Sequence, residues 1–216
     1  MSWGLGNRLN GVLNHIPKGD GVMFGWPVCP DHCGATWEDL FSTQLNVLPW
    51  DSMSAPKEWT RLTQDYWFNP AISGQSMEEV RQFIHSLKPS AVVRARMVDI
   101  PKGTVGWHVR SLAPASRIAK RDIVTVPRDV FLACDYTAQL MKSPNVYQTR
   151  MAQRSDYDKG RGLSHMLTAV ADWFCLMQCE SIVEVGLPFK GFRSIHSTYT
   201  DCHRLIGIPV TNLTRD

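Results

Sequence analysis

The sequence predicts an α/β fold built on a parallel sheet that is covered on both faces. Two observations lead to this prediction. Short apolar runs typical of buried strands alternate with helical segments along most of the chain. In addition, 44% of the 216 residues are hydrophobic, which is enough for a sizeable core in one large domain or two small ones.

Charge and hydropathy exclude several classes of protein. The net charge is only +3, and basic residues are interspersed with acidic ones, so nucleic acid is not an expected partner. No apolar run approaches the roughly 18 residues of a membrane span. The N-terminus lacks the charged and apolar regions of a signal peptide. These features predict a cytoplasmic protein.

Six cysteines occur in the chain, and without an export signal they are expected to be reduced thiols. Cys175 and Cys179 lie one helical turn apart among apolar neighbours and are predicted to belong to the core. The other thiols include Cys29 and Cys33, which flank His32. Their spacing matches no standard zinc finger, so no metal site is predicted.

The first 88 residues contain four predicted elements, too few for a complete α/β unit. These are a helix at 7–16, a buried strand at 21–28, a short helix at 36–41 and a helix at 76–87. Pro17 ends the first helix, and Ser76 followed by Glu79 forms a capping-box pattern at the start of the last one. Residues 42–75 show no clear periodicity. A reduced N-terminal α/β half over residues 1–88 is therefore predicted.

Residues 89–216 alternate between strands and helices more regularly. The predicted elements are a helix beginning at Pro89, strands at 103–111 and 128–135, a short helix at 136–143, a strand at 145–149, a long helix at 162–179, a strand at 181–186, and a helix end leading to a strand over 202–210. This order predicts a Rossmann-like parallel sheet that forms a nucleotide-binding half.

Polar side chains follow the carboxyl ends of these strands, where open α/β sheets bind ligands. His108 and Arg110 end one strand, Asp135 ends the next, and the "STYT" segment at 197–200 follows a third. An arginine forks onto phosphate oxygens, an aspartate accepts hydrogen bonds from a base or ribose, and small hydroxyls hold further phosphate oxygens. The pattern fits a nucleoside diphosphate.

Six motifs in a fixed order also carry a family resemblance. They are "GLGNRL" at 4–9, Trp26 and Cys33 with "TWEDLF" at 36–41, "GWHVRS" at 106–111, "FLACD" at 131–135, "AVADWFCLMQCE" at 169–180 and "STYT" at 197–200. In this order they resemble the nucleotide-sugar-dependent fucosyltransferase superfamily, which includes nodulation, core α1,6- and protein O-fucosyltransferases.

The resemblance implies a GT-B-like fold and an inverting transfer that needs no metal and no cofactor other than the nucleotide-sugar donor. A GDP-linked sugar is the favoured donor, and a glycan or another hydroxyl compound is the acceptor. The implied catalytic residues are Arg110, Asn7 and Arg8. The implied donor-binding residues are Gly6, His108, Asp135, Asp172, Ser197 and Thr198. The Gly6–Arg8 loop would form the lip of a cleft whose main wall is the C-terminal half.

Two departures from the family pattern keep an alternative open. Ser111 stands where the family has a second arginine, and Ala113 stands where an acidic residue often follows. A degenerate nucleotide-sugar-binding protein without turnover is therefore the second hypothesis. A DNA-modifying glycosyltransferase is a third, which the modest net charge disfavours. Structural roles are also open, since Asp135 could cap a helix and His108 could shape the strand end.

Overall fold

A computed structural model describes most of the chain. The described residues are 5–14, 24–28, 33–45, 47–50, 68–69, 74–109, 123–134, 139–142, 145–149, 162–186 and 197–214. The predicted site residues Arg110 and Asp135 lie outside these ranges, as do Cys29 and His32. In the described part of the chain, every helix is too short or too polar to cross a membrane.

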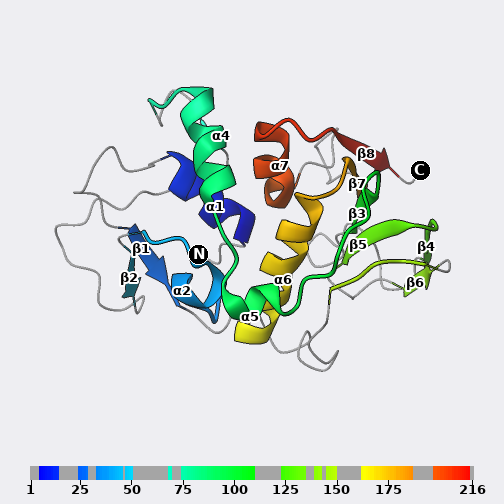
Figure 1. Ribbon diagram of the computed structural model, residues 1–216, viewed down its shortest axis with the longest axis horizontal. Coiled ribbons are helices and arrows are strands. Elements are labelled where there is room, and N and C mark those ends of the chain that lie inside the picture. The colour runs from blue at the N-terminus through cyan, green and yellow to red at the C-terminus, as the bar shows by residue number, and fades with distance from the viewer. Residues whose placement is uncertain are drawn as a thin grey trace.

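Helices and strands alternate along the chain (Figure 1). The helices are α1 (Leu5–Asn14), α2 (Trp37–Leu40), α4 (Met77–Ser86), α5 (Ala91–Arg94), α6 (Leu163–Leu176), the 3-10 turn η2 (Thr198–Thr200) and α7 (Asp201–Leu205). The strands are β1 (Phe24–Pro27), β2 (Val47–Trp50), β3 (Val105–Val109), β4 (Ile123–Val126), β5 (Val130–Cys134), β6 (Gln139–Lys142), β7 (Ser181–Gly186) and β8 (Val210–Thr214).

The main sheet has four parallel strands in the order β5-β3-β7-β8, so the expected α/β fold with a parallel sheet is confirmed. The chain runs from β3 to β5 on one side of β3 and then crosses to β7 on the other side. The strand order therefore reverses between β3 and β7. In this register His108 of β3 pairs with Glu184 of β7 and with Ala133 of β5.

One face of the sheet packs on α6. Phe131, Ala133 and Ile182 of the sheet cluster there with Cys175 and Leu176 of the helix. Close approach depends on Gly106 of β3, because a Cβ atom there would lie 2.5 Å from Leu176 Cδ2. The two layers can thus pack together only where the strand carries no side chain.

The opposite face is covered differently from the expectation for a helix-covered sheet. In the described residues, the cover is the two-stranded parallel sheet β4-β6, whose Val124 and Val126 cluster with Val109, Leu132 and Val185. Figure 1 shows this small sheet beyond the main sheet, on the side away from α6. Valine side chains from two stacked sheets suffice to bury the surface that a helix would otherwise cover.

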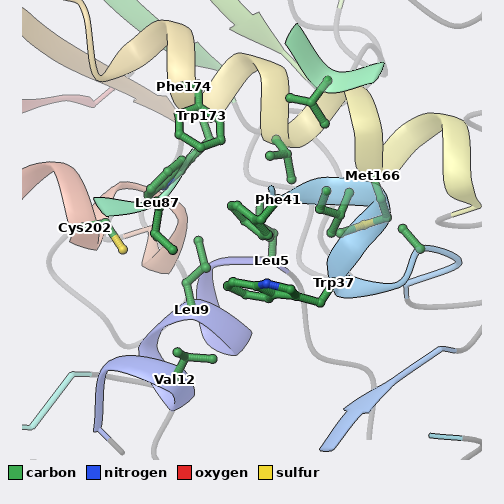
Figure 2. Packing of buried hydrophobic residues seen from close by; sticks show 14 of the residues in the cluster. Leu5, Leu9, Val12, Trp37, Phe41, Leu87, Met166, Trp173, Phe174 and Cys202 are labelled. Carbon is green, nitrogen blue, oxygen red and sulfur yellow. The ribbon is translucent and has the colours of Figure 1, made fainter. Parts of the chain in front are cut away.

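Helix α6 lies between the sheet and the N-terminal elements, which explains why most of its side chains are buried. Its outer side joins the largest hydrophobic cluster, shown in Figure 2 with side chains from α1, α2 and α7 around it. Trp37 stacks on Phe41, and Phe41 meets Phe174 of α6 edge-on. The cluster thus includes residues on both sides of position 88, and the division into 1–88 and 89–216 stays a prediction.

Local signals located several elements correctly. The capping box at the start of α4 is confirmed, because Glu79 N donates to Ser76 Oγ and Ser76 N donates to Glu79 Oε2. Predicted helices at 7–16, 36–41 and 162–179 correspond to α1, α2 and α6, and most predicted strands correspond to observed ones. The predicted strand at 145–149 makes a single parallel bridge, from Tyr147 to Phe131 at the edge of the sheet.

Three predictions of secondary structure are wrong. The segment predicted as a helix at 136–143 contains strand β6, because pairing with β4 outweighs a weak local helix preference. Pro89 lies before the helix rather than in its first turn, and Ser90 is the N-cap of the short α5. The sequence Gly6–Arg8 was expected to form a loop but lies within α1. Strands β2 and β4 had no predicted counterpart.

Candidate functional site

The candidate site lies at the carboxyl ends of β3 and β7, where the strand order reverses. In open parallel sheets the loops after two such strands diverge and leave a crevice for a ligand. His108 is the penultimate residue of β3, and Glu184 is its register partner on β7. Both side chains lie on the α6 side of the sheet, because side chains two residues apart in a strand share a face. Two residues earlier, Gly106 and Ile182 face α6.

His108 meets the predicted hydroxyl motif. Its Nε2 lies 3.4 Å from Ser197 Oγ, a contact between residues 89 positions apart. Its ring stacks on Tyr199 with centroids 4.7 Å apart and planes at 17°. Tyr199 in turn donates its hydroxyl to the carbonyl oxygen of Ala169 on α6. The strand end and the turn of η2 therefore form one unit, as predicted for His108 and Ser197.

Glu184 of β7 holds this turn through hydrogen bonds. The buried carboxylate accepts a hydrogen bond from the hydroxyl of Thr200 and another from Arg204 Nη2 at 2.8 Å. Arg204 Nη1 also donates to Thr200 Oγ1 at 2.8 Å, and Thr200 N donates to the Ser197 carbonyl at 3.1 Å. A charge-assisted network thus holds the turn against β7.

Helix α1 is attached to the same network. Asn10 Nδ2 donates to Asp201 Oδ2 at 2.6 Å, and Asp201 Oδ1 lies 3.6 Å from Arg204 Nη1. Gly6 lies one turn before Asn10 on the same face of the helix and is buried. Residues 5–9 of the "GLGNRL" motif therefore belong to a helix that packs against the C-terminal part of the chain, not to a loop.

Arg8 occupies another face of α1. The Cζ of its guanidinium lies 5.1 Å from the ring centroid of Trp26, a cation–π contact. Trp26 is held by its indole N–H, which donates to the carbonyl oxygen of Ala35 at 3.0 Å, and by an edge-on contact with Trp37. The contact places Arg8 beside the aromatic residues of the N-terminal elements. Asn7 is partly buried in the first half of the same helix.

Asp172 is buried in α6 and accepts a hydrogen bond from Thr149 Oγ1 at 2.6 Å. Burial raises the pKa of its carboxyl to about 7, and the bond from Thr149 opposes this rise. The side chain can therefore hold a proton close to neutral pH. Thr149 lies two residues after the bridge at Tyr147, which places Asp172 toward the β5 edge of the sheet.

The five cysteines that the structure describes and His203 are buried in the core. Burial raises the pKa of Cys175 and of Cys179 to about 12, so both thiols are poor nucleophiles, in keeping with their predicted core role. Burial lowers the pKa of His203 to about 4, and its Nε2 lies 3.0 Å from the carbonyl oxygen of Trp173. In the described ranges no three His, Cys, Asp or Glu side chains lie together as metal ligands would.

Sequence reasoning missed the anchors of the site. Asn10, Glu184 and Arg204 were not selected, although an acidic residue in the apolar run "SIVEVG" is a visible signal of a buried partner. Of the predicted residues, His108 and Ser197 are brought together. Thr198, the residue after Ser197, is the first residue of η2. The described contacts of Asp172 and Arg8 are with other residues. Asp172 accepts a hydrogen bond from Thr149, and Arg8 contacts Trp26.

Comparisons with protein-family models, curated proteins and solved structures found no match to this chain.

Proposed function

We propose that this chain is an inverting, metal-independent glycosyltransferase of GT-B type. It moves a sugar from a nucleoside-diphosphate donor, with a GDP-linked sugar favoured, to a hydroxyl group of a glycan or another acceptor. The diphosphate of the donor binds at the carboxyl ends of β3 and β7. Residues 89–216 supply most of this binding surface, and α1 contributes from the N-terminal part.

One observation carries the proposal. His108 of the "HVR" motif and Ser197 of the "STYT" motif, which sequence reasoning assigned to the same donor site, lie 3.4 Å apart between Nε2 and Oγ. They meet at the point where the strand order of a parallel sheet reverses, which is the general position of ligand sites in such folds. Imidazole and hydroxyl groups are donors suited to phosphate oxygens.

The proposed reaction is a single displacement. The acceptor oxygen forms a bond to the anomeric carbon while the bond from that carbon to the diphosphate breaks, and the proton of the acceptor hydroxyl passes to solvent water. Negative charge develops on the leaving diphosphate, so groups that bind it more strongly in the transition state accelerate the reaction. Arg110 is the residue directly after β3, two positions after His108. Its proposed role is to pair with the negative charge that develops on the diphosphate.

A second candidate function is nucleotide-sugar binding without turnover. Ser111 and Ala113 favour it, because they stand where the resembling family has a second arginine and an acidic residue. Binding and transfer separate the two functions. A donor that binds tightly but is neither hydrolysed nor transferred would favour the binding protein.

The decisive experiment has two parts. A thermal-shift panel of GDP-, UDP-, dTDP- and CMP-sugars identifies the nucleotide, because a ligand that binds the folded state raises the melting temperature. Transfer from the stabilising donor is then measured with and without EDTA, and activity should persist. An activity that EDTA abolishes and manganese restores would contradict the proposed chemistry.

Variants of Arg110 test the assigned role. Arg110→Ala should lower kcat/KM by about a hundredfold or more, comparable with the loss of one oxyanion donor. Arg110→Lys should recover only part of the loss, since an ammonium group lacks the planar fork of a guanidinium. Circular dichroism controls for folding. A folded Arg110→Ala protein that transfers sugar at the wild-type rate would refute the assignment.

A further inference from the structure

We infer that Tyr199 is a positioning residue of the ligand site, which holds the His108 imidazole in the orientation that binds the diphosphate. This inference rests on the proposed function. It concerns a residue that makes no assigned contact with the substrate and acts through His108.

Two described contacts restrain the His108 ring. Tyr199 lies flat against the ring at 4.7 Å with only 17° between the planes, while Ser197 Oγ faces Nε2 at 3.4 Å. Strand β3, which carries His108, is itself packed closely against α6 at Gly106, two residues before His108. A stacked partner restrains rotation about the second side-chain torsion of a histidine, which is otherwise broad.

Tyr199 is itself fixed at both ends. Its hydroxyl donates to the Ala169 carbonyl on α6, and its N–H lies 3.4 Å from Ser197 Oγ. The next residue, Thr200, is bonded to Glu184 and to Arg204. The ring is therefore carried by an anchored turn and can act as a rigid wall for the imidazole rather than as a mobile cover.

The expected consequence is a loss of affinity when the wall is removed. An unrestrained His108 must lose rotational freedom when a phosphate binds, which costs up to about tenfold in affinity for one side chain. Tyr199→Leu should therefore weaken GDP binding by about tenfold, and Tyr199→Phe should bind within about twofold of the wild type because it keeps the stacked ring.

Tyr147 supplies a matched control. It is also a partly buried tyrosine packed against the cluster between the sheet and α6, but it lies beside Phe131 at the far edge of the sheet. Tyr147→Leu should lower the melting temperature and leave the Kd for GDP unchanged. If Tyr199→Leu does not fold, Tyr199→Met replaces it, because an unbranched thioether fills irregular space without providing a flat ring.

The test combines calorimetry with a double-mutant cycle. GDP binding is titrated for the wild type, Tyr199→Leu, His108→Ala and the double variant. Tyr199→Leu should cost nothing further when His108 is absent, and the ring resonances of His108 in labelled protein should move in Tyr199→Leu and return in Tyr199→Phe.

The outcomes are distinct. An equal loss of affinity in the His108→Ala background, or a folded Tyr199→Leu protein with unchanged Kd, would overturn the positioning role and leave the proposed function intact. A wild-type protein that binds neither GDP nor any nucleotide sugar of the panel would overturn both.

Discussion

Asp172 and Glu184 are both buried carboxylates on the α6 side of the sheet, with 5% and 1% of the residue exposed, but their surroundings differ. Among its described contacts, Asp172 has one hydroxyl partner, Thr149. Glu184 has the hydroxyl of Thr200 and the guanidinium of Arg204 at 2.8 Å. Among the residues that the structure describes, nearly equal burial thus occurs with an opposite charge beside Glu184 and with only a hydroxyl group beside Asp172.

The difference shows how a protein keeps a carboxylate inside. Removing a charge from water is costly, and one neutral hydrogen bond does not offset the cost, so Asp172 holds a proton up to a pH of about 7. An opposite charge with good geometry offsets part of the cost of removing a buried carboxylate from water. Glu184 and Arg204 also connect β7 to the turn that faces His108, so the ion pair lies where rigidity serves the proposed site.

Asp172→Asn should produce the largest effect in this comparison. The folded pKa of about 7 lies above the ordinary 3.8, so the carboxyl contributes stability that is present below pH 3.8 and lost as pH rises through 7. Relative to the wild type, Asp172→Asn should gain up to roughly 4 kcal/mol in unfolding free energy between pH 4 and pH 8. Urea denaturation across this range measures it, and a constant difference would contradict the raised pKa.

His203 sharpens the comparison because it changes the free energy of unfolding with pH in the opposite direction from Asp172. Its folded pKa of about 4 lies below the ordinary 6.5, so the stability it contributes is present above pH 6.5 and lost as pH falls through 4. Between these values the slopes from His203 and Asp172 should nearly cancel in the wild type. His203→Gln should expose the Asp172 slope, with stability falling by roughly 3 kcal/mol from pH 4 to pH 6.5.

The slopes of denaturation free energy against pH provide the readout for His203, because the substitution itself changes packing against Trp173. If the wild-type free energy of unfolding changes steeply with pH in this window, and the slope is the same in His203→Gln, then the two groups do not oppose each other.

Arg204→Ala breaks the compensated side of the comparison. It leaves Glu184 buried without its positive partner and should destabilise the protein by about 2 to 3 kcal/mol at pH 7. The lower part of the usual range is expected, because the Arg204 side chain is 25% exposed and water can replace part of the contact. Arg204→Lys keeps the charge and should recover about half of the loss. Equal stability of wild type and Arg204→Ala in urea would show that the pair contributes nothing.

Asn10→Ala should have the smallest effect. It removes a hydrogen bond from Asn10 to the Asp201 carboxylate, worth about 1.5 kcal/mol for a bond to a charged group. A double-mutant cycle with Asp201→Asn isolates the pairwise part of the loss, and strictly additive single losses would show that α1 is not held through this bond.

Local sequence signals predicted the elements whose reasons are local. The box formed by Ser76 and Glu79 specifies the start of α4 through bonds between residues three apart. The mostly apolar run at 162–179 indicated a long helix, and the structure has α6 there. By contrast, the segment 136–143 has a composition compatible with a helix, but its residues 139–142 form β6, because they pair with β4 in the small sheet that covers the main one.

The candidate site was predictable only in part, for a related reason. His108 and Ser197 were selected because they end or follow strands, and parallel strands bring such positions to one edge. The anchors could not be selected in the same way. Glu184 was visible as an acid within an apolar strand, but its partner Arg204 lies 20 residues away, and nothing in the spacing connects them.

By itself, the sequence determined most of the alternation of strands and helices, the N-terminal cap of α4 and the long helix α6, because periodicity and capping act between residues within one or two turns. The strand order β5-β3-β7-β8 was decided by the tertiary structure, and with it the reversal that places His108 beside Glu184. So were the cover of the outer sheet face by β4-β6 and the different treatment of two buried carboxylates. Burial and charge compensation depend on which side chains meet in space, and that is set by packing between elements far apart in the chain.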